Sequence, residues 1–301
     1  MTIYSERSIF QKIVTHPAFL LIAGLVITFV FMAAVGAVLQ ATIPQPVKSD
    51  VDELIGYSAI SAFCVAGYWV FTRFVERKPF SDFALPGAGK EWLYGAAIGS
   101  AVMALVVGVI ALFGGYKIVG QNGADVLIGV LSVAIISGIT EEILFRGIIF
   151  RFFEQWLGSY FALAISALFF GLVHLGNPNA SWLAAFAIAI EAGIMLGAIY
   201  MLTRRLWAAV GLHMAWNSVQ GGVFGIAVSG TDVPGLLISK TSGPDILTGG
   251  AFGAEASLPA IILCTGVGVY FLWRAKQKGQ VIAPSMHRFK TGEAAADTPV
   301  L

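Results

Sequence analysis

Residues 18–39 read AFLLIAGLVITFVFMAAVGAVL, a run of 22 residues without a charged side chain. A transmembrane helix needs about 20 consecutive, mostly apolar residues, so this run is long enough to cross a bilayer. It also exceeds the apolar core of a cleaved signal peptide, which has about 7 to 15 residues. We therefore expect these residues to form a membrane span that stays in the mature chain.

The composition of the whole chain agrees with this stretch. Of its 301 residues, 57% are hydrophobic and 12% are charged, and the mean hydropathy is +0.83. Globular proteins carry about 25% charged residues, so a soluble surface cannot be built here. The net charge of +1 excludes polyanion binding driven by bulk electrostatics, and we expect no nucleic-acid partner. Cys64 and Cys264 lie far apart in apolar stretches, so we predict small hydrophobic fillers rather than a disulfide.

Seven further stretches have spanning length, and charged residues or histidines interrupt three of them, namely 126–145, 182–203 and 206–228. The other four are 54–72, 92–116, 155–173 and 256–273. We therefore predict an all-α fold, a polytopic membrane helix bundle with about eight transmembrane helices.

The distribution of positive charge predicts the orientation of the bundle. With the N-terminus in the cytoplasm, 15 of the 18 Lys and Arg residues fall on the cytoplasmic side. Only Lys48, Lys117 and Lys240 fall on the other side. This asymmetry predicts that both termini are cytoplasmic, in a multi-pass protein of the bacterial cytoplasmic membrane.

We divide the chain into three parts. Residues 1–16 form a cytoplasmic or interfacial N-terminal segment, and 17–275 form the membrane domain, with its chemistry concentrated in about 125–220. Residues 276–301 are predicted to be a disordered cytoplasmic tail. The glycine-rich stretch 230–257 is predicted to be a long extracytoplasmic loop.

Ionisable residues inside spans are costly to bury, and each one is a functional hypothesis. Glu142 and Arg146 stand at i and i+4 with the acid first, so they can pair on one helix face. Glu141 points about 100° away and lacks that partner. We predict a structural pair beside a freer Glu141 that acts as a general base, and the alternative is an interfacial charge pair without chemistry.

Two further i, i+4 pairs follow on later spans, Phe170 with His174 and His213 with Asn217. Each pair also has a purely structural interpretation. The first could be a hydrogen-bonded core histidine packed beside a phenylalanine, and the second could provide polar contacts between helices. Glu141 lies 17 residues before the turn expected at Gly158, and His174 lies 16 residues after it. Two antiparallel helical legs would place these two side chains level with each other.

Glu191 stands alone in the middle of the span 182–203. It either pairs with a neighbour or lines the same cavity as the other polar residues, and the sequence leaves both possibilities open.

The three motifs, in this order on successive spans, resemble the CPBP family of intramembrane proteases. That family includes the type II CAAX prenyl endopeptidases and the bacterial abortive-infection and bacteriocin-immunity proteins. Residues 247–257 are similar to a loop of bacterial members, with no chemistry assigned to it. The motifs are Glu141-Glu142-x-x-x-Arg146, Phe170-x-x-x-His174 and His213-x-x-x-Asn217.

The resemblance implies an endopeptidase that hydrolyses a peptide bond of a membrane-associated protein or peptide. Glu141 would activate the attacking water with help from His174. His213 and Asn217 would polarise the scissile carbonyl and stabilise the oxyanion. The supporting residues implied are Glu142, Arg146 and Phe170.

The hydrolysis could proceed with or without a catalytic zinc ion. A catalytic zinc site usually has three protein ligands and a water, and Glu141, His174 and His213 could supply such a set. Asn217 fits that set poorly, and the HExxH helix of many zinc proteases is absent. We therefore predict a glutamate-activated water without an obligatory metal, with zinc as the alternative.

Two other function classes compete with the protease. Glu and His residues within spans also form proton relays in proton-coupled transporters. Such carriers show repeated halves, whereas the polar residues here cluster between 141 and 217. The third possibility is a catalytically idle membrane binding or immunity protein, which an intact set of polar residues argues against.

Overall fold

The computed structural model describes residues 13–42 and 49–284. In this part of the chain, seven helical elements are long and apolar enough to cross a membrane. They are Pro17–Thr42, Asp50–Val75, Ala88–Leu112, Ala124–Leu157, Ser159–Gly176, Trp182–Thr203 and Leu258–Gln277. Their α-helices are α2 (Pro17–Thr42), α3 (Asp50–Val70), α4 (Ala88–Leu112), α5 (Leu127–Glu142), α6 (Arg151–Leu157), α7 (Ser159–Val173), α8 (Trp182–Ile188), α9 (Ile194–Thr203) and α12 (Leu258–Gln277).

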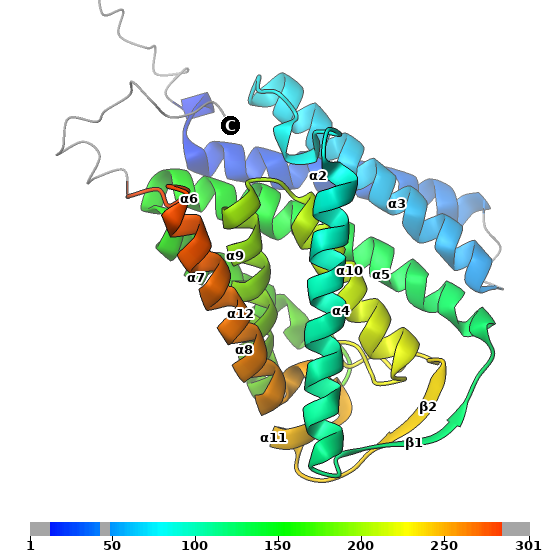
Figure 1. Cartoon of the computed structure of the whole chain (residues 1–301). Helices are drawn as coiled ribbons and strands as arrows, with labels where there is room; N and C mark the ends of the chain where they lie inside the picture. Colours follow the sequence, from blue (N-terminus) through cyan, green and yellow to red (C-terminus); the bar gives the residue numbers. More distant parts are fainter. Residues whose placement is uncertain (1–12, 43–48, 285–301) are drawn as a thin grey trace, which may run out of the picture.

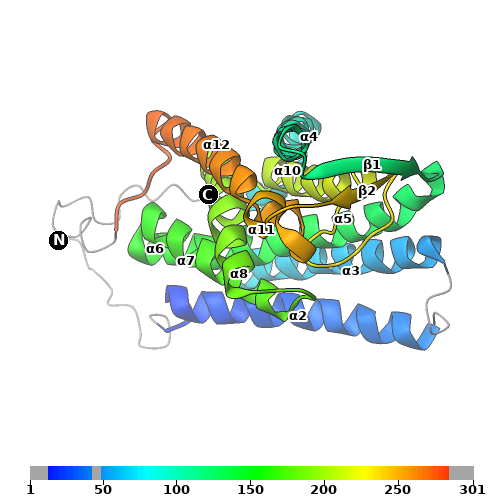
Figure 2. The same ribbon diagram turned by 90° about the horizontal axis from the view of Figure 1, so that it is seen from below.

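The eighth predicted span, 206–228, is a shorter helix inside the bundle. It consists of α10 (Trp207–Asn217) and a π-helical continuation, Ser218–Val223. Figures 1 and 2 show α10 packed between α4 and α5, and most of its side chains are buried. A helix surrounded by protein does not need the full length of a lipid-facing span. The predicted all-α membrane bundle is confirmed.

Glycines allow α10 to approach α4 closely. A Cβ atom added at Gly95 or Gly99 of α4 would collide with the backbone of α10, and one at Gly211 of α10 would collide with α4. Small residues four apart let two membrane helices pack backbone to backbone. This contact holds the helix segment that carries His213 and Asn217.

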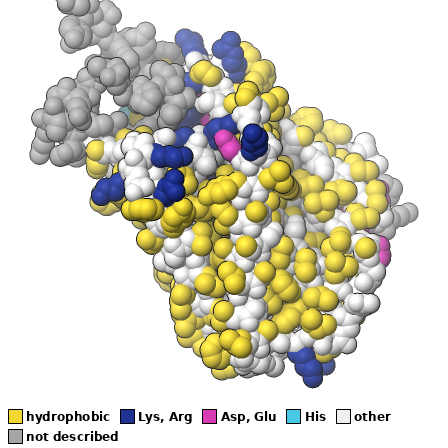
Figure 3. Space-filling view, in the orientation of Figure 1, with side chains coloured by type: hydrophobic (Ala, Val, Ile, Leu, Met, Phe, Trp, Pro, Cys, Tyr) yellow, Lys and Arg dark blue, Asp and Glu magenta, His cyan; other side chains and the backbone are white. Residues whose placement is uncertain are grey.

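Ion pairs collect at one end of the bundle. They join Arg151 to Glu76, Arg204 to Glu154 and Arg205 to Glu91. Figure 3 shows Lys and Arg side chains gathered at this end of the visible face. The arginines are among those that the sequence analysis assigned to the cytoplasmic side.

The opposite end carries a small sheet that the sequence analysis missed. Strand β1 (Tyr116–Gln121) pairs antiparallel with β2 (Leu237–Thr241), and Lys117 lies opposite Lys240. The predicted span 92–116 was displaced by four residues toward the C-terminus, because α4 runs from Ala88 to Leu112 and ends before the strand begins. The predicted loop 230–257 was also wrong, since β2 and the short helix α11 (Asp245–Thr248) lie within it.

The two ends of the chain lie partly outside the described residues. Of the predicted cytoplasmic or interfacial segment 1–16, residues 1–12 lie outside the described residues, so this prediction is not tested. The boundary predicted at residue 275 falls inside α12, which ends at Gln277. Ile282 exchanges hydrogen bonds with Ser159, so the start of the predicted tail is packed on the bundle, while 285–301 lie outside the described residues.

Candidate active site

The acidic pair lies where α5 changes its helical geometry. Helix α5 ends at Glu142, and a π-helical segment, Ile143–Phe150, continues the chain. Arg146 Nη1 donates to Glu142 Oε1 at 2.9 Å, and both side chains are 0% exposed. The predicted i, i+4 pair is confirmed. π-Helical turns inside longer helices occur frequently at functional sites.

Arg146 ties three helical elements together. Its Nη2 donates to the carbonyl oxygens of Gly193 at 3.1 Å and Ala192 at 3.3 Å, both in the π-helical turn between α8 and α9. Its guanidinium carbon lies 4.5 Å from the ring centroid of Phe170 on α7. A buried arginine with this many fixed partners holds the site together and is not placed to react.

His213 lies between the two adjacent glutamates. Its Nδ1 is 2.9 Å from Glu142 Oε1, and its Nε2 is 3.9 Å from Glu141 Oε2. A carboxylate paired with arginine accepts hydrogen bonds, so Nδ1 carries the hydrogen and the ring is held in one orientation. Glu142 therefore orients His213 as well as pairing with Arg146. The sequence analysis missed this contact, because 71 residues separate the two side chains.

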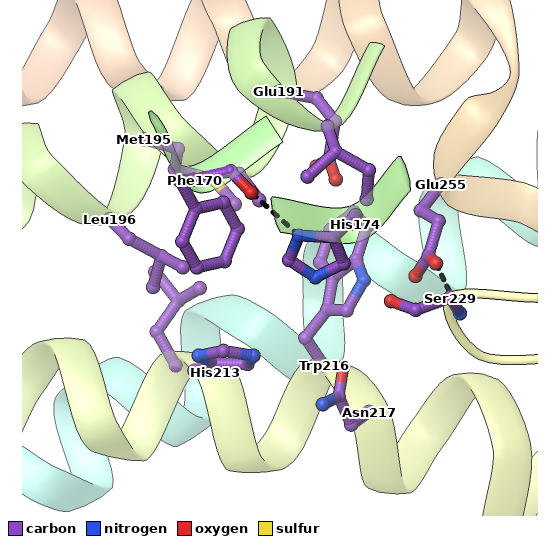
Figure 4. A pocket seen from close by; sticks show the side chains of 13 residues that line it. Phe170, His174, Glu191, Met195, Leu196, His213, Trp216, Asn217, Ser229 and Glu255 are labelled. Atoms are coloured by element: carbon purple, nitrogen blue, oxygen red, sulfur yellow. Dashed lines mark hydrogen bonds between the residues drawn. The ribbon is translucent and has the colours of Figure 1, made fainter. Parts of the chain in front are cut away.

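His174 is oriented in the same way from another helix. It follows the last residue of α7, and its Nδ1 lies 2.6 Å from the carbonyl oxygen of Phe170. A carbonyl oxygen only accepts, so Nδ1 carries the hydrogen and Nε2 keeps its lone pair. Figure 4 shows the imidazole in the middle of the pocket. The Phe170 ring lies 4.9 Å from the His174 ring and 6.1 Å from the His213 ring.

Asn217 is fixed by a residue that the sequence analysis did not single out. Its Nδ2 donates to Ser137 Oγ on α5 at 2.9 Å. The amide group carries two hydrogens, and this bond uses one of them. The other is available to a ligand in the pocket.

One cavity brings together His174 from the turn after α7, His213 and Asn217 from α10, and Glu191 from the turn between α8 and α9. Its other described lining residues are Phe170, Ile188, Ala192, Met195, Leu196, Leu212, Trp216, Ser229 and Glu255. Glu141 does not line the cavity itself. Its side chain is 28% exposed and lies beyond His213, and Glu141 Oε2 is buried without a hydrogen-bond partner.

The register of the α5–α6 and α7 legs agrees with the expected hairpin. The chain turns at Gly158, and the rings of Phe145 and Phe170 meet with centroids 5.0 Å apart. Phe145 lies four residues after Glu141, and Phe170 lies four residues before His174. The contact between the two rings therefore has the same antiparallel register that would place Glu141 level with His174. After His174 the helix gives way to a polar segment, where Asn177 and Asn179 donate to the carbonyl oxygens of Ser229 and Gly230.

Glu255 is a site residue that the sequence analysis did not single out. It lies in a short 3-10 turn, Ala254–Ala256, and accepts the backbone N–H of Ser229. Its only sequence signal was its place in the stretch 247–257, which is similar to a family loop. The sequence left open whether Glu191 pairs with a neighbour or lines the cavity, and the structure shows that it lines the cavity.

Burial raises the pKa of Glu255 from 4.5 to about 7, and hydrogen bonds from Ser229 oppose part of this rise. Between pH 4.5 and pH 7, Glu255 is protonated in the folded protein and ionised in the unfolded chain. The free energy of unfolding should therefore fall as pH rises from 4.5 to 7, by up to about 1.4 kcal/mol per pH unit.

Melting temperatures of the parent and Glu255→Gln proteins across this interval measure the effect. We expect the melting temperature of the variant to depend less on pH. Glu191, which interacts with residue 255, is present in both proteins and is therefore common to the comparison. Parallel profiles would contradict the assignment of this titration to Glu255.

The predicted zinc set is not assembled as a metal site. In the described residues, no three His, Cys, Asp or Glu side chains lie close enough together to hold a metal ion. Glu141 and His213 approach each other, but Glu142 already engages His213 Nδ1. The side-chain arrangement of the described residues therefore does not fit a His₂Glu zinc site.

Residues 123–219 match the family model described as type II CAAX prenyl endopeptidase Rce1-like. Comparisons with curated proteins and with solved structures gave no match. The matched residues carry most of the polar side chains of the cavity and are similar to those of an intramembrane protease. The match covers about a third of the chain and agrees with the CPBP family that the three motifs resemble. The match includes Glu191 but not Glu255.

Proposed function

We propose that the protein is an intramembrane endopeptidase that hydrolyses a peptide bond of a membrane-associated protein or peptide. One observation carries the proposal. His174, at the end of α7, and His213 and Asn217, both on α10, line one cavity, and the unpartnered Glu141 Oε2 lies 3.9 Å from His213 Nε2. An unpartnered carboxylate oxygen beside the oriented imidazole of His213 is suited to general-base catalysis.

The proposed reaction begins with water. Glu141 removes a proton from the water, with His174 Nε2 accepting a hydrogen bond from it, and the resulting hydroxide attacks the carbonyl carbon. The carbonyl oxygen takes the negative charge in the tetrahedral intermediate. The carbon–nitrogen bond then breaks, and Glu141 returns the proton to the leaving amine.

The oxyanion is stabilised by groups that are already oriented. Asn217 keeps one amide hydrogen free while Ser137 Oγ accepts the other. When His213 carries both ring hydrogens, the hydrogen on Nδ1 stays on Glu142 and the one on Nε2 is available to the oxyanion. Donors that need no reorganisation contribute most to transition-state stabilisation.

Comparison of membrane-protein fragments tests this function in cells. We expect fragments that appear with the parent protein and are missing with Glu141→Gln. The same substitution at Glu53, near the start of α3 and remote from the site, should leave the fragments unchanged. Identical fragment sets for the parent and Glu141→Gln would reject the protease.

Metal dependence is tested on the purified protein. We expect cleavage to persist after prolonged treatment with zinc chelators, because Glu141 is proposed to activate water without a metal. Loss of activity that about one zinc per chain restores would overturn this expectation. The side chains of Glu141, His174 and His213 would then have to rearrange to bind the metal.

A further inference from the structure

The cavity holds two acidic side chains that the proposed reaction does not use. Glu191 lies in the π-helical turn Ala189–Gly193 between α8 and α9 and is 0% exposed. Glu255 lies in the 3-10 turn before α12 and is 2% exposed. Figure 4 shows both side chains beside His174, and their charges are close enough to interact.

Glu191 has no polar partner that would explain its burial. Neither of its carboxylate oxygens has a hydrogen-bond partner among the described residues. The thiol of Cys264 lies against it, and a thiol is only a weak donor. Burying a carboxyl group without a partner is costly, so this arrangement is not explained by structural stability.

Other deeply buried glutamates of this chain are paired. Glu76, Glu142 and Glu154 each form an ion pair with an arginine. None of the described residues that line the cavity is Lys or Arg. The cavity therefore contains two acids and lacks the arginine that pairs with each of those other buried acids.

Glu255 is held in place by neutral groups. The backbone N–H of Ser229 donates to it, and Gln220 and Trp216 lie beside it. The ring of Trp216 also lines the cavity, and an indole face attracts cations. These contacts orient the carboxyl group without supplying a positive charge, which leaves it able to pair with a cationic ligand.

The chemistry of the ligand follows from these observations. No three His, Cys, Asp or Glu side chains in the described residues are arranged to hold a metal ion, which disfavours a divalent metal at this pair. An organic cation, an ammonium or guanidinium group, needs only carboxylates and an aromatic wall. The same cavity contains His174 and Asn217, so the cation would belong to a residue close to the scissile bond.

We propose that Glu191 and Glu255 form a subsite that binds a lysine or arginine side chain of the substrate next to the scissile bond. This subsite rests on the proposed protease function, because it names the residue that the protease selects. A neutral or acidic residue at this position would not form the charged hydrogen bonds that a basic residue forms with the two acids, so the basic residue would be preferred.

Cation binding can be measured without proteolysis. The probe is n-butylammonium, compared with uncharged butyramide at equal ionic strength, on the purified full-length protein in detergent. We expect n-butylammonium to raise the melting temperature in a concentration-dependent way, and Glu191→Gln and Glu255→Gln to lose this response. The control variant Glu53→Gln should keep it. A response that the two variants share with the parent, or no response in the parent, would overturn the subsite.

Selectivity is measured with apolar peptides of about 20 residues in proteoliposomes. A single lysine, arginine, norleucine or glutamate is placed at successive positions near the cleavage point. We expect the basic residue to raise kcat/KM about 100-fold over norleucine at one position, and both Gln variants to lose most of this preference. Equal cleavage of all peptides would overturn the subsite and leave the protease intact. Cation binding without cleavage of any peptide would instead reject the protease.

A stability measurement separates recognition from a structural role. Glu191→Gln removes a buried carboxyl group that has no partner, so we expect its melting temperature to equal or exceed that of the parent. If Glu191→Gln lowered the melting temperature as much as Arg146→Ala does, Glu191 would have a structural role, and the proposed subsite would be overturned. Glu255→Gln provides the second variant for the binding and cleavage measurements.

Discussion

Replacing Glu141 by Gln is expected to slow peptide cleavage by about 100-fold to 10,000-fold while the fold stays intact. The amide keeps the shape of the side chain and cannot accept the proton of the attacking water. Glu141 Oε2 has no hydrogen-bond partner, and the neighbouring Glu142, not Glu141, pairs with Arg146. The substitution therefore removes the base without breaking a buried ion pair.

Initial rates on a substrate found by the fragment comparison measure this effect, and melting temperatures check the fold. Glu53→Gln is the matched control, since it makes the same chemical change at the start of α3. A purified Glu141→Gln protein that cleaves at the parent rate would end the assignment of Glu141 as the base. A large fall in its melting temperature would also contradict the freer role of this residue.

Arg146→Ala is expected to lower the free energy of unfolding by about 3 to 5 kcal/mol, because it leaves a buried charge unpaired. Glu142 is 0% exposed and would lose its partner. The carbonyl oxygens of Ala192 and Gly193 would lose a donor at the same time. Activity should fall too, since Glu142 would no longer hold His213 in a fixed orientation.

Thermal or denaturant unfolding of the purified protein measures this loss. Arg205→Ala is the matched control, because the pair of Arg205 with Glu91 is partly exposed and exposed pairs contribute little. The double variant Glu142→Gln, Arg146→Met removes both charges and should recover part of the stability. Equal melting temperatures for Arg146→Ala and the parent would show that the pair does not support the fold.

Several features of this protein follow from sequence alone, because they depend on local physical chemistry. A run such as 18–39 has to cross a bilayer as a helix, since lipid offers no partner for an exposed backbone group. Helical geometry brings residues i and i+4 together, which predicted the contact between Glu142 and Arg146. The order of the three motifs was sufficient to predict the family that the match over 123–219 supports.

Other features depend on contacts between distant parts of the chain, and only the tertiary structure decided them. The pairing of β1 with β2 joins segments more than 100 residues apart, and neither strand has a strong signal of its own. The hydrogen bond between His213 and Glu142 depends on the close packing of α10 against its neighbours. The meeting of Glu191 with Glu255 depends on how the segment before α12 folds back over the cavity. Hydropathy and helical periodicity specify what each helix does by itself, but side-chain packing selects which polar groups face one another.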